Sequence, residues 1–419
     1  MRSAGAGEAL DEGERTGPPA DLADLAPTVL AHLREHRARM TDLLRELAEM
    51  ETPSRSPATQ GAILERIGGL LRDLGFRTRR LPGRSTGGHL FARAGRRGRG
   101  GDAQLLLGHC DTVWPPGTLA TMPVEVEGDV IRGPGVFDMK GGLVQMIFAL
   151  SALRQLDLRP EVEPAVLVTS DEEIGSPESV RWVRLLARRV RRAWVLEPAL
   201  GPGGALKTAR KGTGSFEIRV VGRGAHVGLA PEEGASAIQE LSHVVQHLHG
   251  LSDRERGLTV NVGEIEGGVR PNVVAPEARA VVDVRVPTLE AGGEVEEAIR
   301  SMEAATPGTR LVVTGGINRP PMERTPGTRR LWEAAEALGR AMGLELREGT
   351  AGGASDGNFT ARFTPTLDGL GAVGDGAHAD HEHARLDRMP ERSALLALLL
   401  LLPAGTASGA AGRREGGGP

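Results

Sequence analysis

Metal-binding side chains follow three apolar stretches of this chain. The stretch "AQLLLGH" ends at His109, and Asp111 follows it two residues later. The stretch "EPAVLVTSDEE" ends in Glu172 and Glu173, and "AWVLEP" contains Glu197 just before a proline. Imidazole nitrogens and carboxylate oxygens are typical ligands of zinc and related divalent metals. The sequence therefore predicts metal-assisted chemistry at the ends of strands.

Two further segments carry side chains of the same kinds. Asp138 lies in the glycine-rich segment "GPGVFDMKGG", and His378 lies in "GAHADHEHARLD". We prefer His378 as a ligand over His381 and His383, which we expect to be exposed. Taken alone, Asp138 could instead cap a helix, where aspartate is favoured. All the segments together, in this order, favour a metal site.

The charge of the candidate ligands fits two metal ions better than one. Three carboxylates and one hydroxide would balance two divalent cations, and two imidazoles would complete the ligand set. The five candidate ligands are His109, Asp138, Glu173, Glu197 and His378. Mixed nitrogen and oxygen ligands suit two Zn2+ ions, with Co2+ or Mn2+ as possible substitutes. Asp138 could bridge the pair, because a carboxylate offers one oxygen to each ion.

Two neighbouring residues are expected to act beside the ligands. Asp111 lies two residues after His109, so on an extended chain both side chains face the same side, and the carboxylate can orient the imidazole. Glu172 precedes a ligand and points away from it, which makes it the candidate general base. Cys110 would then point into the core.

The pattern of strands and helices predicts the fold that positions these residues. Continuous apolar strands alternate with amphipathic helices, which is typical of an α/β fold with a mostly parallel sheet. Ligands of such folds bind at the carboxyl ends of the strands. We expect a last strand near Leu367–Val373, shortly before His378. Between Arg210 and Ile317 the apolar pattern has period two, which indicates an inserted α+β domain with antiparallel strands.

These patterns divide the chain into five segments. We expect a disordered leader (1–21), a catalytic domain in two parts (22–209 and 318–405), the inserted domain (210–317) and a flexible tail (406–419). The leader lacks the apolar region of a signal peptide, and the apolar stretch near the C-terminus is too short to span a bilayer. We therefore expect a cytoplasmic protein.

Composition argues against several classes of function. The net charge of −4 gives no reason to expect nucleic acid or a membrane as partner. One cysteine excludes an internal disulfide and a multi-cysteine zinc site, and the absence of tyrosine excludes phenolic acid–base chemistry. No G-x-x-x-x-G-K-[ST] loop is present, which argues against a nucleotide-dependent ligase.

Four motifs resemble those of a known enzyme family. "GHCDTV", "GPGVFDMKGG", "DEEIGS" and "LEPA" resemble, in order, the signature of the co-catalytic zinc peptidases. That family includes glutamate carboxypeptidase, the acetylornithine and succinyl-diaminopimelate deacylases, and aminoacylase. The resemblance covers roughly residues 22–402, and "DTVWPPGT" and "IGSPES" are most similar to the glutamate carboxypeptidase branch.

The resemblance implies how the ligands are shared. His109, Asp138 and Glu197 would bind one zinc ion. Glu173 and His378 would bind the other, together with the shared Asp138. Glu172 would transfer the proton in this scheme.

The resemblance also implies roles for the inserted domain, which is similar to a ferredoxin-like dimerisation domain. His226 would reach the site of a neighbouring subunit in a homodimer and polarise the scissile carbonyl. Asn272 and Arg285 would hold the carboxylate of the substrate, and Arg319 is a further candidate for this task. Arg285 could instead pair with a neighbouring acid.

These observations lead to one expected function and two alternatives. We expect a di-zinc metallohydrolase of the glutamate carboxypeptidase type, which cleaves an amide next to a free carboxylate in a small peptide or N-acyl-amino acid. The first alternative is an N-acyl-amino-acid deacylase. The second is a non-catalytic metal-binding protein on the same fold.

Overall fold

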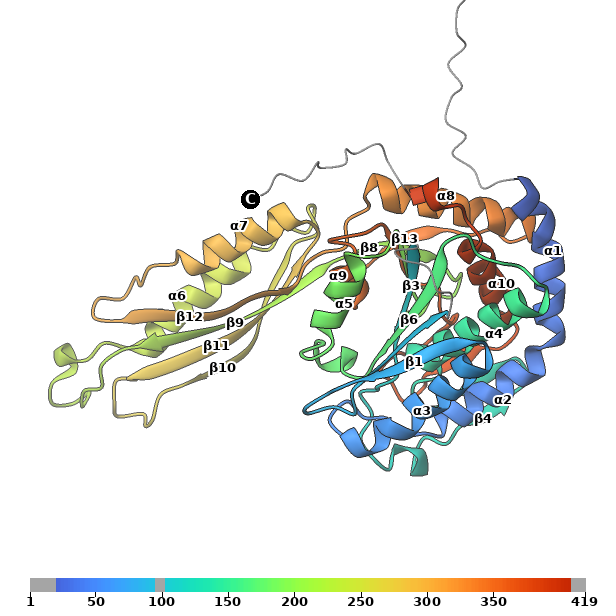
Figure 1. The fold of residues 1–419 in the computed structure, drawn as a ribbon. Coiled ribbons are helices and arrows are strands. Elements are labelled where there is room, and N and C mark those ends of the chain that lie inside the picture. The colour runs from blue at the N-terminus through green and yellow to red at the C-terminus, as the bar shows by residue number, and fades with distance from the viewer. Residues whose placement is uncertain (1–19, 95–101, 408–419) are drawn as a thin grey trace, which may run out of the picture.

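The computed structural model describes residues 20–94 and 102–407 of the chain (Figure 1). Most of the predicted leader and tail lies outside these residues. The described chain overlaps each of them by two residues, since residues 20–21 begin a helix and 406–407 end a helical turn, and the division into five segments stays a prediction. The described chain forms an α/β domain and an elongated antiparallel domain that extends to one side of it (Figure 1).

A six-stranded sheet lies at the centre of the α/β domain, with the strand order β1-β2-β6-β3-β7-β14. Strands β6, β3, β7 and β14 are parallel, whereas β2 runs antiparallel to both of its neighbours, β6 and the edge strand β1. The strands are β1 (Phe76–Leu81), β2 (His89–Ala94), β3 (Ala103–His109), β6 (Glu163–Thr169), β7 (Ala193–Val195) and β14 (Thr366–Leu367). The predicted α/β class with a mostly parallel sheet is confirmed. The strand expected over Leu367–Val373 is wrong beyond its first residue, since the chain then leaves the sheet.

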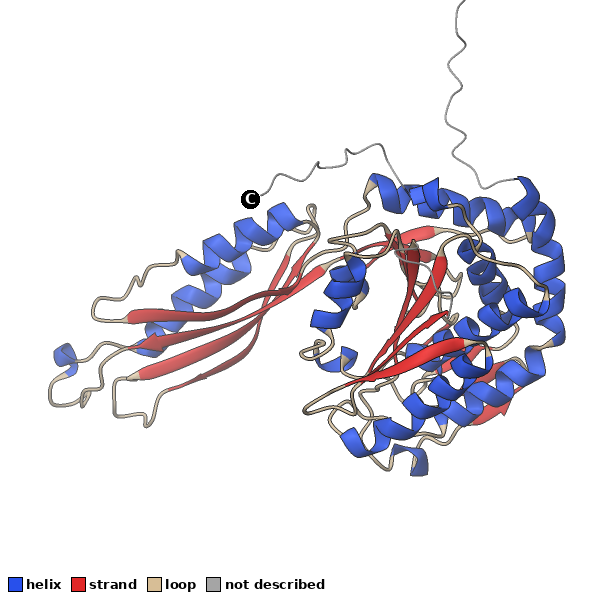
Figure 2. Cartoon of the chain, viewed as in Figure 1, coloured by secondary structure: helices blue, strands red, loops and turns tan. Residues whose placement is uncertain are grey.

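Helices cover both faces of this sheet, because side chains on successive strand residues point to opposite faces. On one face, Leu105 and Leu107 pack with Val183 of α5 and Phe359 of α9. On the other face, Leu106 lies in the larger core built with the remaining helices (Figure 2). The helices are α1 (Ala20–Glu35), α2 (Arg37–Ala48), α3 (Pro57–Asp73), α4 (Gly141–Gln155), α5 (Val180–Ala187), α8 (Pro326–Ala341), α9 (Gly357–Thr360) and α10 (Met389–Leu400).

Two of these helices are nearly all apolar and lie inside the larger core. The segment Val136–Gln155, which includes α4, is long and apolar enough to cross a membrane, but 83% of its apolar 18-residue stretch is buried in the fold. Helix α10 is buried along its whole length and packs against α1 and α4. Both therefore have the character of core helices in a globular domain.

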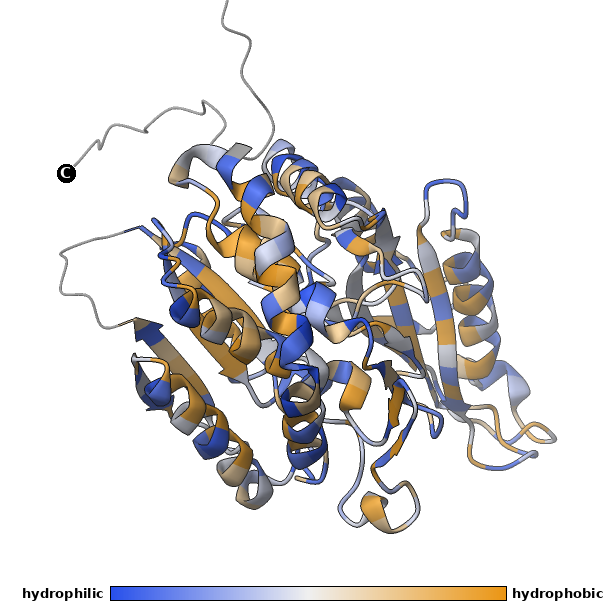
Figure 3. Ribbon diagram, turned by 90° about the vertical axis from the view of Figure 1, so that its right-hand side faces the viewer, coloured by the Kyte–Doolittle hydropathy of each residue, from blue (hydrophilic) through white to orange (hydrophobic). Residues whose placement is uncertain are grey.

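The antiparallel domain has a core of its own. Its strands follow the order β10-β11-β9-β12, and their inward residues pack under two helices. Figure 3 shows hydrophobic and hydrophilic residues alternating along these strands, as expected for a sheet with one face exposed. The elements are β9 (Gly212–Val221), α6 (Ala237–Gly250), β10 (Thr259–Gly267), β11 (Glu277–Val286), α7 (Leu289–Arg300) and β12 (Arg310–Arg319).

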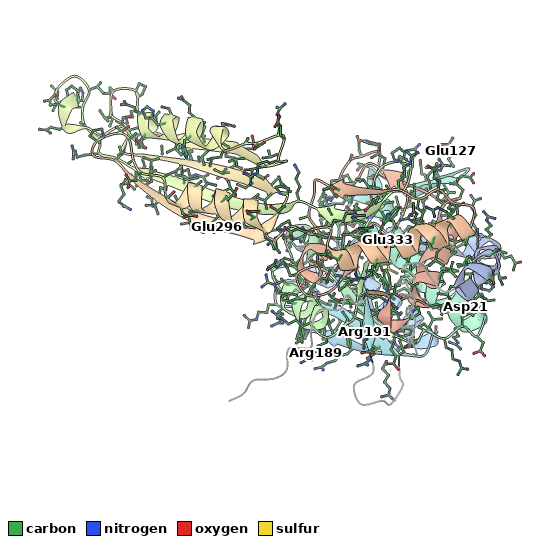
Figure 4. All side chains as sticks on the ribbon, turned by 90° about the horizontal axis from the view of Figure 1, so that it is seen from above. Asp21, Glu127, Arg189, Arg191, Glu296 and Glu333 are labelled. Atoms are coloured by element: carbon green, nitrogen blue, oxygen red, sulfur yellow. The ribbon has the colours of Figure 1, made fainter. Side chains whose placement is uncertain are left out.

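The two domains are joined where β9 begins and β12 ends. In Figure 4, Glu333 of α8 lies on the α/β domain, and Glu296 of α7 lies on the antiparallel domain. Before the chain enters β9, strand β8 (Leu206–Arg210) pairs with β13 (Glu348–Ala351) of the α/β domain.

Several short strands and helical turns complete the described chain. The minor strands are β4 (Glu125–Glu127), β5 (Val130–Arg132), β8, β13, β15 (Gly374–Asp375) and β16 (His383–Arg385). The helical turns are η1 (Thr118–Ala120), η2 (Val136–Lys140), η3 (Glu172–Ile174), η4 (Pro231–Glu233) and η5 (Ala404–Ala407).

Candidate metal centre

The carboxyl ends of β3 and β7 bring three of the predicted ligands together. His109 is the last residue of β3, and its Nε2 lies 3.2 Å from Asp138 Oδ1. The same nitrogen lies 3.5 Å from Glu197 Oε1, just beyond β7. All three side chains are largely buried, so their donor atoms face one another in a protected site.

Asp138 also faces a second group of predicted ligands. Its Oδ2 lies 3.6 Å from His378 Nε2, and that nitrogen lies 3.0 Å from Glu173 Oε2. One oxygen of Asp138 thus faces each group, as a bridging carboxylate would. His378 has a φ of 62°, in the left-handed region that costs a side-chain-bearing residue about 1 kcal/mol or more.

The donor groups fit divalent cations. Ligand atoms of His109, Asp138 and Glu173 lie within 4.8 Å of one another, and so do those of His109, Glu172 and Glu197. Burial, with Asp138 close by, raises the pKa of Glu197 to about 8 and that of Glu173 to about 7. Cations bound among these carboxylates would relieve that repulsion, because an opposite charge favours the ionised form.

Asp111 connects the end of β3 to the turn after β6. His109 Nδ1 lies 3.0 Å from the backbone oxygen of Asp111 and 3.4 Å from its Oδ1. The carboxylate also accepts hydrogen bonds from Ser54 Oγ at 2.7 Å and from the backbone N–H groups of Glu172 and Glu173. Asp111 therefore fixes both the imidazole and the acidic turn, which is the kind of orienting contact expected for it.

Glu172 lies beside the donor groups and is bound by Arg319. The guanidinium donates to the Glu172 carboxylate, to its backbone oxygen at 2.8 Å, and to Ser176 Oγ at 2.8 Å. Burial raises the pKa of Glu172 to about 7, while the positive charge of Arg319 opposes that rise. A carboxyl group with a pKa near neutrality can accept and release a proton under ordinary conditions.

Glu382 is a residue of the site that the sequence analysis missed. Its carboxylate accepts the backbone N–H groups of Gly135, Phe137 and Asp138 at 2.9–3.0 Å, and the Trp114 indole N–H at 3.0 Å. It thereby links the loop that carries Asp138 to the segment that carries His378. The sequence held no signal for this, because an acidic residue among three histidines looks like part of an exposed, polar turn.

Arg210 is a second residue that the sequence analysis missed. Its guanidinium contacts Glu197 Oε2 at 3.1 Å and Asp368 Oδ2 at 2.6 Å, and all three side chains are buried. Arg210 ends β8, and Asp368 directly follows β14. Arg210, itself bound by Asp368, therefore holds the oxygen of Glu197 that does not face His109.

The structure places two other candidates far from the metal donors and pairs a third with a neighbouring acid. His226 and Asn272 lie in adjacent loops, where Val227 N donates to the Asn272 oxygen at 3.3 Å. Both loops follow the ends of β9 and β10 that point away from the α/β domain (Figure 1). The guanidinium of Arg285 pairs with the Asp283 carboxylate at 2.7 and 2.9 Å, the alternative considered for it.

Two local predictions concern neighbours of the ligands. Cys110 is buried in the core, and burial raises the pKa of its thiol to about 12, which leaves it unreactive. His381 is exposed, as expected. His383 is half-buried, so the expectation of exposure is wrong there, because the residue lies in β16, paired with β5 and β15.

The fold and the site together define a class of protein. A mostly parallel sheet that gathers two groups of imidazole and carboxylate donors, with a further buried carboxylate beside them, is the arrangement of a metal-dependent hydrolase. The family model "Peptidase family M20/M25/M40" matches residues 105–402. The chain belongs to this family and is an enzyme that acts on amide bonds.

Two named enzymes are among the relatives of this chain. The chain is 29% identical over 340 residues to carboxypeptidase G2 of Pseudomonas sp. (strain RS-16), covering 79% of this chain and 81% of that protein. It is 28% identical over 363 residues to the succinyl-diaminopimelate desuccinylase of Gluconacetobacter diazotrophicus, covering 81% and 91%. Both resemblances extend over most of each chain.

Solved structures share the fold. The aminopeptidase PepT from Bacillus cereus superposes with a TM-score of 0.71 at 20% identity, covering 87% of this chain and 98% of that one. The metallo-carboxypeptidase Sso-CP2 from Sulfolobus solfataricus superposes with a TM-score of 0.65 at 16% identity, with the same coverage. At such low identity these likenesses support the fold alone.

Proposed function

We propose that this chain is a di-zinc hydrolase of the glutamate carboxypeptidase type, which cleaves an amide bond next to a free carboxylate. The observation that carries the proposal is the buried carboxylate of Glu172 within 4.8 Å of donor atoms of His109 and Glu197. Close by, the two oxygens of Asp138 face His109 and His378. The similarity to carboxypeptidase G2 supports the substrate class. The cytoplasmic location expected from the sequence stays a prediction.

The residues of this chain would divide the work as follows. His109, Asp138 and Glu197 would hold one metal ion, and Glu173 and His378 would hold the other with the shared Asp138. Two bound ions would make a water molecule more acidic and stabilise the charge that develops on the carbonyl oxygen.

Proton transfer would then fall to Glu172. It would take a proton from the attacking water and deliver it to the leaving amine, which departs as a neutral amine. Asp111 would keep the imidazole of His109 aimed at its ligand position throughout.

We also propose that the enzyme acts as a homodimer through the antiparallel domain. Strand β10 is an exposed edge of its sheet, and unpaired edges are ready to pair with another chain. Near the far end of that sheet, Leu229 is 81% exposed, Val269 71% and Ile265 68%. An apolar surface of this kind is typical of a protein contact, and such a contact would bring His226 of one subunit to another subunit's site.

A substrate panel with matched variants tests the proposed function. Dipeptides, N-acyl-amino acids and acylglutamates are incubated with the zinc-loaded wild type, with Glu172→Gln and with Glu127→Gln, an exposed control. We expect Glu172→Gln to bind zinc normally and to lose about 10²- to 10⁴-fold in kcat. The control should keep full activity. Equal activity of Glu172→Gln and wild type would contradict the proposal.

The same panel decides between the two hydrolase candidates. The desuccinylase relatives favour an N-acyl-amino-acid deacylase as the second candidate. Preferential cleavage of dipeptides and of glutamates with a large acyl group supports the carboxypeptidase type. Preferential cleavage of amino acids that carry a short acyl group supports the deacylase.

A further inference from the structure

The terminal nitrogens of Arg319 donate hydrogen bonds to other groups of the protein. Its side chain is only 9% exposed, and its two terminal nitrogens contact the carboxylate and backbone oxygen of Glu172 and the hydroxyl of Ser176. Asp356 Oδ1 lies 3.9 Å away, and the guanidinium carbon lies 5.6 Å from the centre of the Phe359 ring. The guanidinium is therefore fixed from several sides.

The contact with Glu172 is of an orienting kind. Arg319 binds both the side chain and the main chain of the same residue, so it fixes the position of the carboxylate relative to its own backbone. Ligand atoms of Glu172, His109 and Glu197 lie within 4.8 Å of one another. The carboxylate thus lies between the guanidinium and the metal donors, which limits the directions in which it can turn.

Arg319 also occupies a special place along the chain. It is the last residue of β12, the strand that returns from the antiparallel domain, and it pairs with Thr213 at the start of the neighbouring strand. The pairing register shifts between Ile317 and Arg319, and Pro320 and Pro321 follow. A bulge and two prolines fix the path of the chain at this join.

We propose that Arg319 is a positioning residue for Glu172, which holds the carboxylate of the general base toward the metal donors and couples it to the join between the domains. The inference rests on the proposed role of Glu172. It gives Arg319 a different task from the substrate-carboxylate binding implied by resemblance. A neutral residue at position 319 would leave the buried carboxylate free to turn away from the attacking water.

Kinetics of three variants test this proposal. We expect Arg319→Gln to lose about 10²-fold in kcat, since a displacement near 1 Å at the reacting groups costs that much, with little change in KM or in zinc affinity. Arg319→Lys should recover part of the loss, because it keeps the charge but not the paired hydrogen bonds. Arg310→Gln, at the exposed start of the same strand, is the matched control and should behave as wild type.

A rise in KM with an unchanged kcat would overturn the proposal and assign Arg319 to the carboxylate of the substrate. Loss of zinc affinity would overturn it in favour of a role in the metal centre. Equal losses of kcat in Arg319→Lys and Arg319→Gln would also contradict the proposal, since the positive charge at position 319 would then have no effect on the position of Glu172.

A second measurement does not depend on activity. The midpoint of thermal unfolding is compared for wild type, Arg319→Gln, Glu172→Gln and the double variant, all free of metal. We expect the second substitution to shift the midpoint less when the first is already present, because the two residues share one interaction. Additive shifts would overturn the proposal. An inactive wild type with non-additive shifts would contradict the proposed function but leave the contact between the two residues supported.

Discussion

At the scale of residues, the proposed metal centre depends on contacts made by side chains that are not themselves proposed ligands. Asp111, Arg210 and Glu382 each bind a proposed ligand or the backbone that carries one. Such contacts fix the orientation of ligands before a metal arrives. The strength of metal binding should therefore respond to these residues nearly as much as to the ligands.

Glu382 gives the clearest test of this idea. Glu382→Gln keeps the size of the side chain but replaces one acceptor oxygen by an N–H donor facing backbone N–H groups. We expect zinc affinity to fall about 10- to 100-fold, measured by competition with a chelator. Asp380→Asn, in the same segment with a side chain that is 99% exposed, is the control and should bind zinc as wild type does. Unchanged affinity of Glu382→Gln would contradict the prediction.

Protonation of the metal-free site predicts how stability depends on pH. The pKa values of Glu173, Glu197 and His378 are raised to about 7, 8 and 9. Between pH 6.5 and 8 the folded state thus binds more protons than the unfolded state, and the free energy of unfolding falls as pH rises. His32, His89 and Lys140, whose pKa values are lowered (that of Lys140 to about 8), bind fewer protons in the folded state and oppose this trend. They contribute less, because the two histidines matter only near pH 6.5 and the lysine only near pH 8.

Urea unfolding with and without zinc checks this dependence. The metal-free protein should be less stable at pH 8 than at pH 6.5, whereas the zinc-loaded protein should lack this loss, since bound cations replace the protons. Greater stability of the metal-free protein at the higher pH would contradict the prediction.

At the scale of elements, close packing of α4 against the segment after β7 sets the position of Glu197. A Cβ atom on Gly142 would lie 2.0 Å from the backbone oxygen of Leu196, the residue before Glu197. Gly371 has a similar constraint on the other side of that segment, where a Cβ would lie 2.2 Å from the same oxygen. The segment that carries Glu197 is thus enclosed between two glycines, and only a residue without a side chain fits.

Gly142→Ala should accordingly damage both stability and the site. We expect a loss of about 1–3 kcal/mol in the free energy of unfolding and weaker zinc binding, because the added methyl group forces α4 away from Leu196. Gly61→Ala, in helix α3 with nothing within 4 Å of the added Cβ, is the control and should be neutral or stabilising by up to about 1 kcal/mol. Equal behaviour of the two variants, in urea unfolding and zinc titration, would contradict this account.

At the scale of the whole molecule, the length of the antiparallel domain is the reason why a catalytic role of His226 requires a second subunit. Strand β9 has ten residues and leads away from the α/β domain, so it spans about 30 Å at 3.3 Å per residue. His226 follows its far end. Within one chain this histidine lies far from His109, and a catalytic role for it therefore requires another subunit.

Mixing of two inactive variants tests that role. His226→Ala and Glu172→Gln are each expected to be nearly inactive, but a dimer of one with the other holds one complete site. Random exchange of subunits should restore about one quarter of wild-type activity, because half of the dimers are mixed and each has one intact site of two. Sedimentation establishes the oligomeric state in parallel. No recovery in a sample proven to exchange subunits would mean that His226 does not act across subunits.

The sequence by itself determined the fold class and the residue types of the site. Continuous and alternating apolar patterns are local properties of a sequence, so they predicted buried and half-exposed strands. The candidate ligands were recognised because they lie at the ends of the buried strands. The tertiary structure decided what depends on distant partners. Glu382 meets the loop of Asp138 across 244 residues, and Arg319 meets Glu172 across 147. Such pairs leave no local pattern, because only packing of the folded chain decides which buried charges meet.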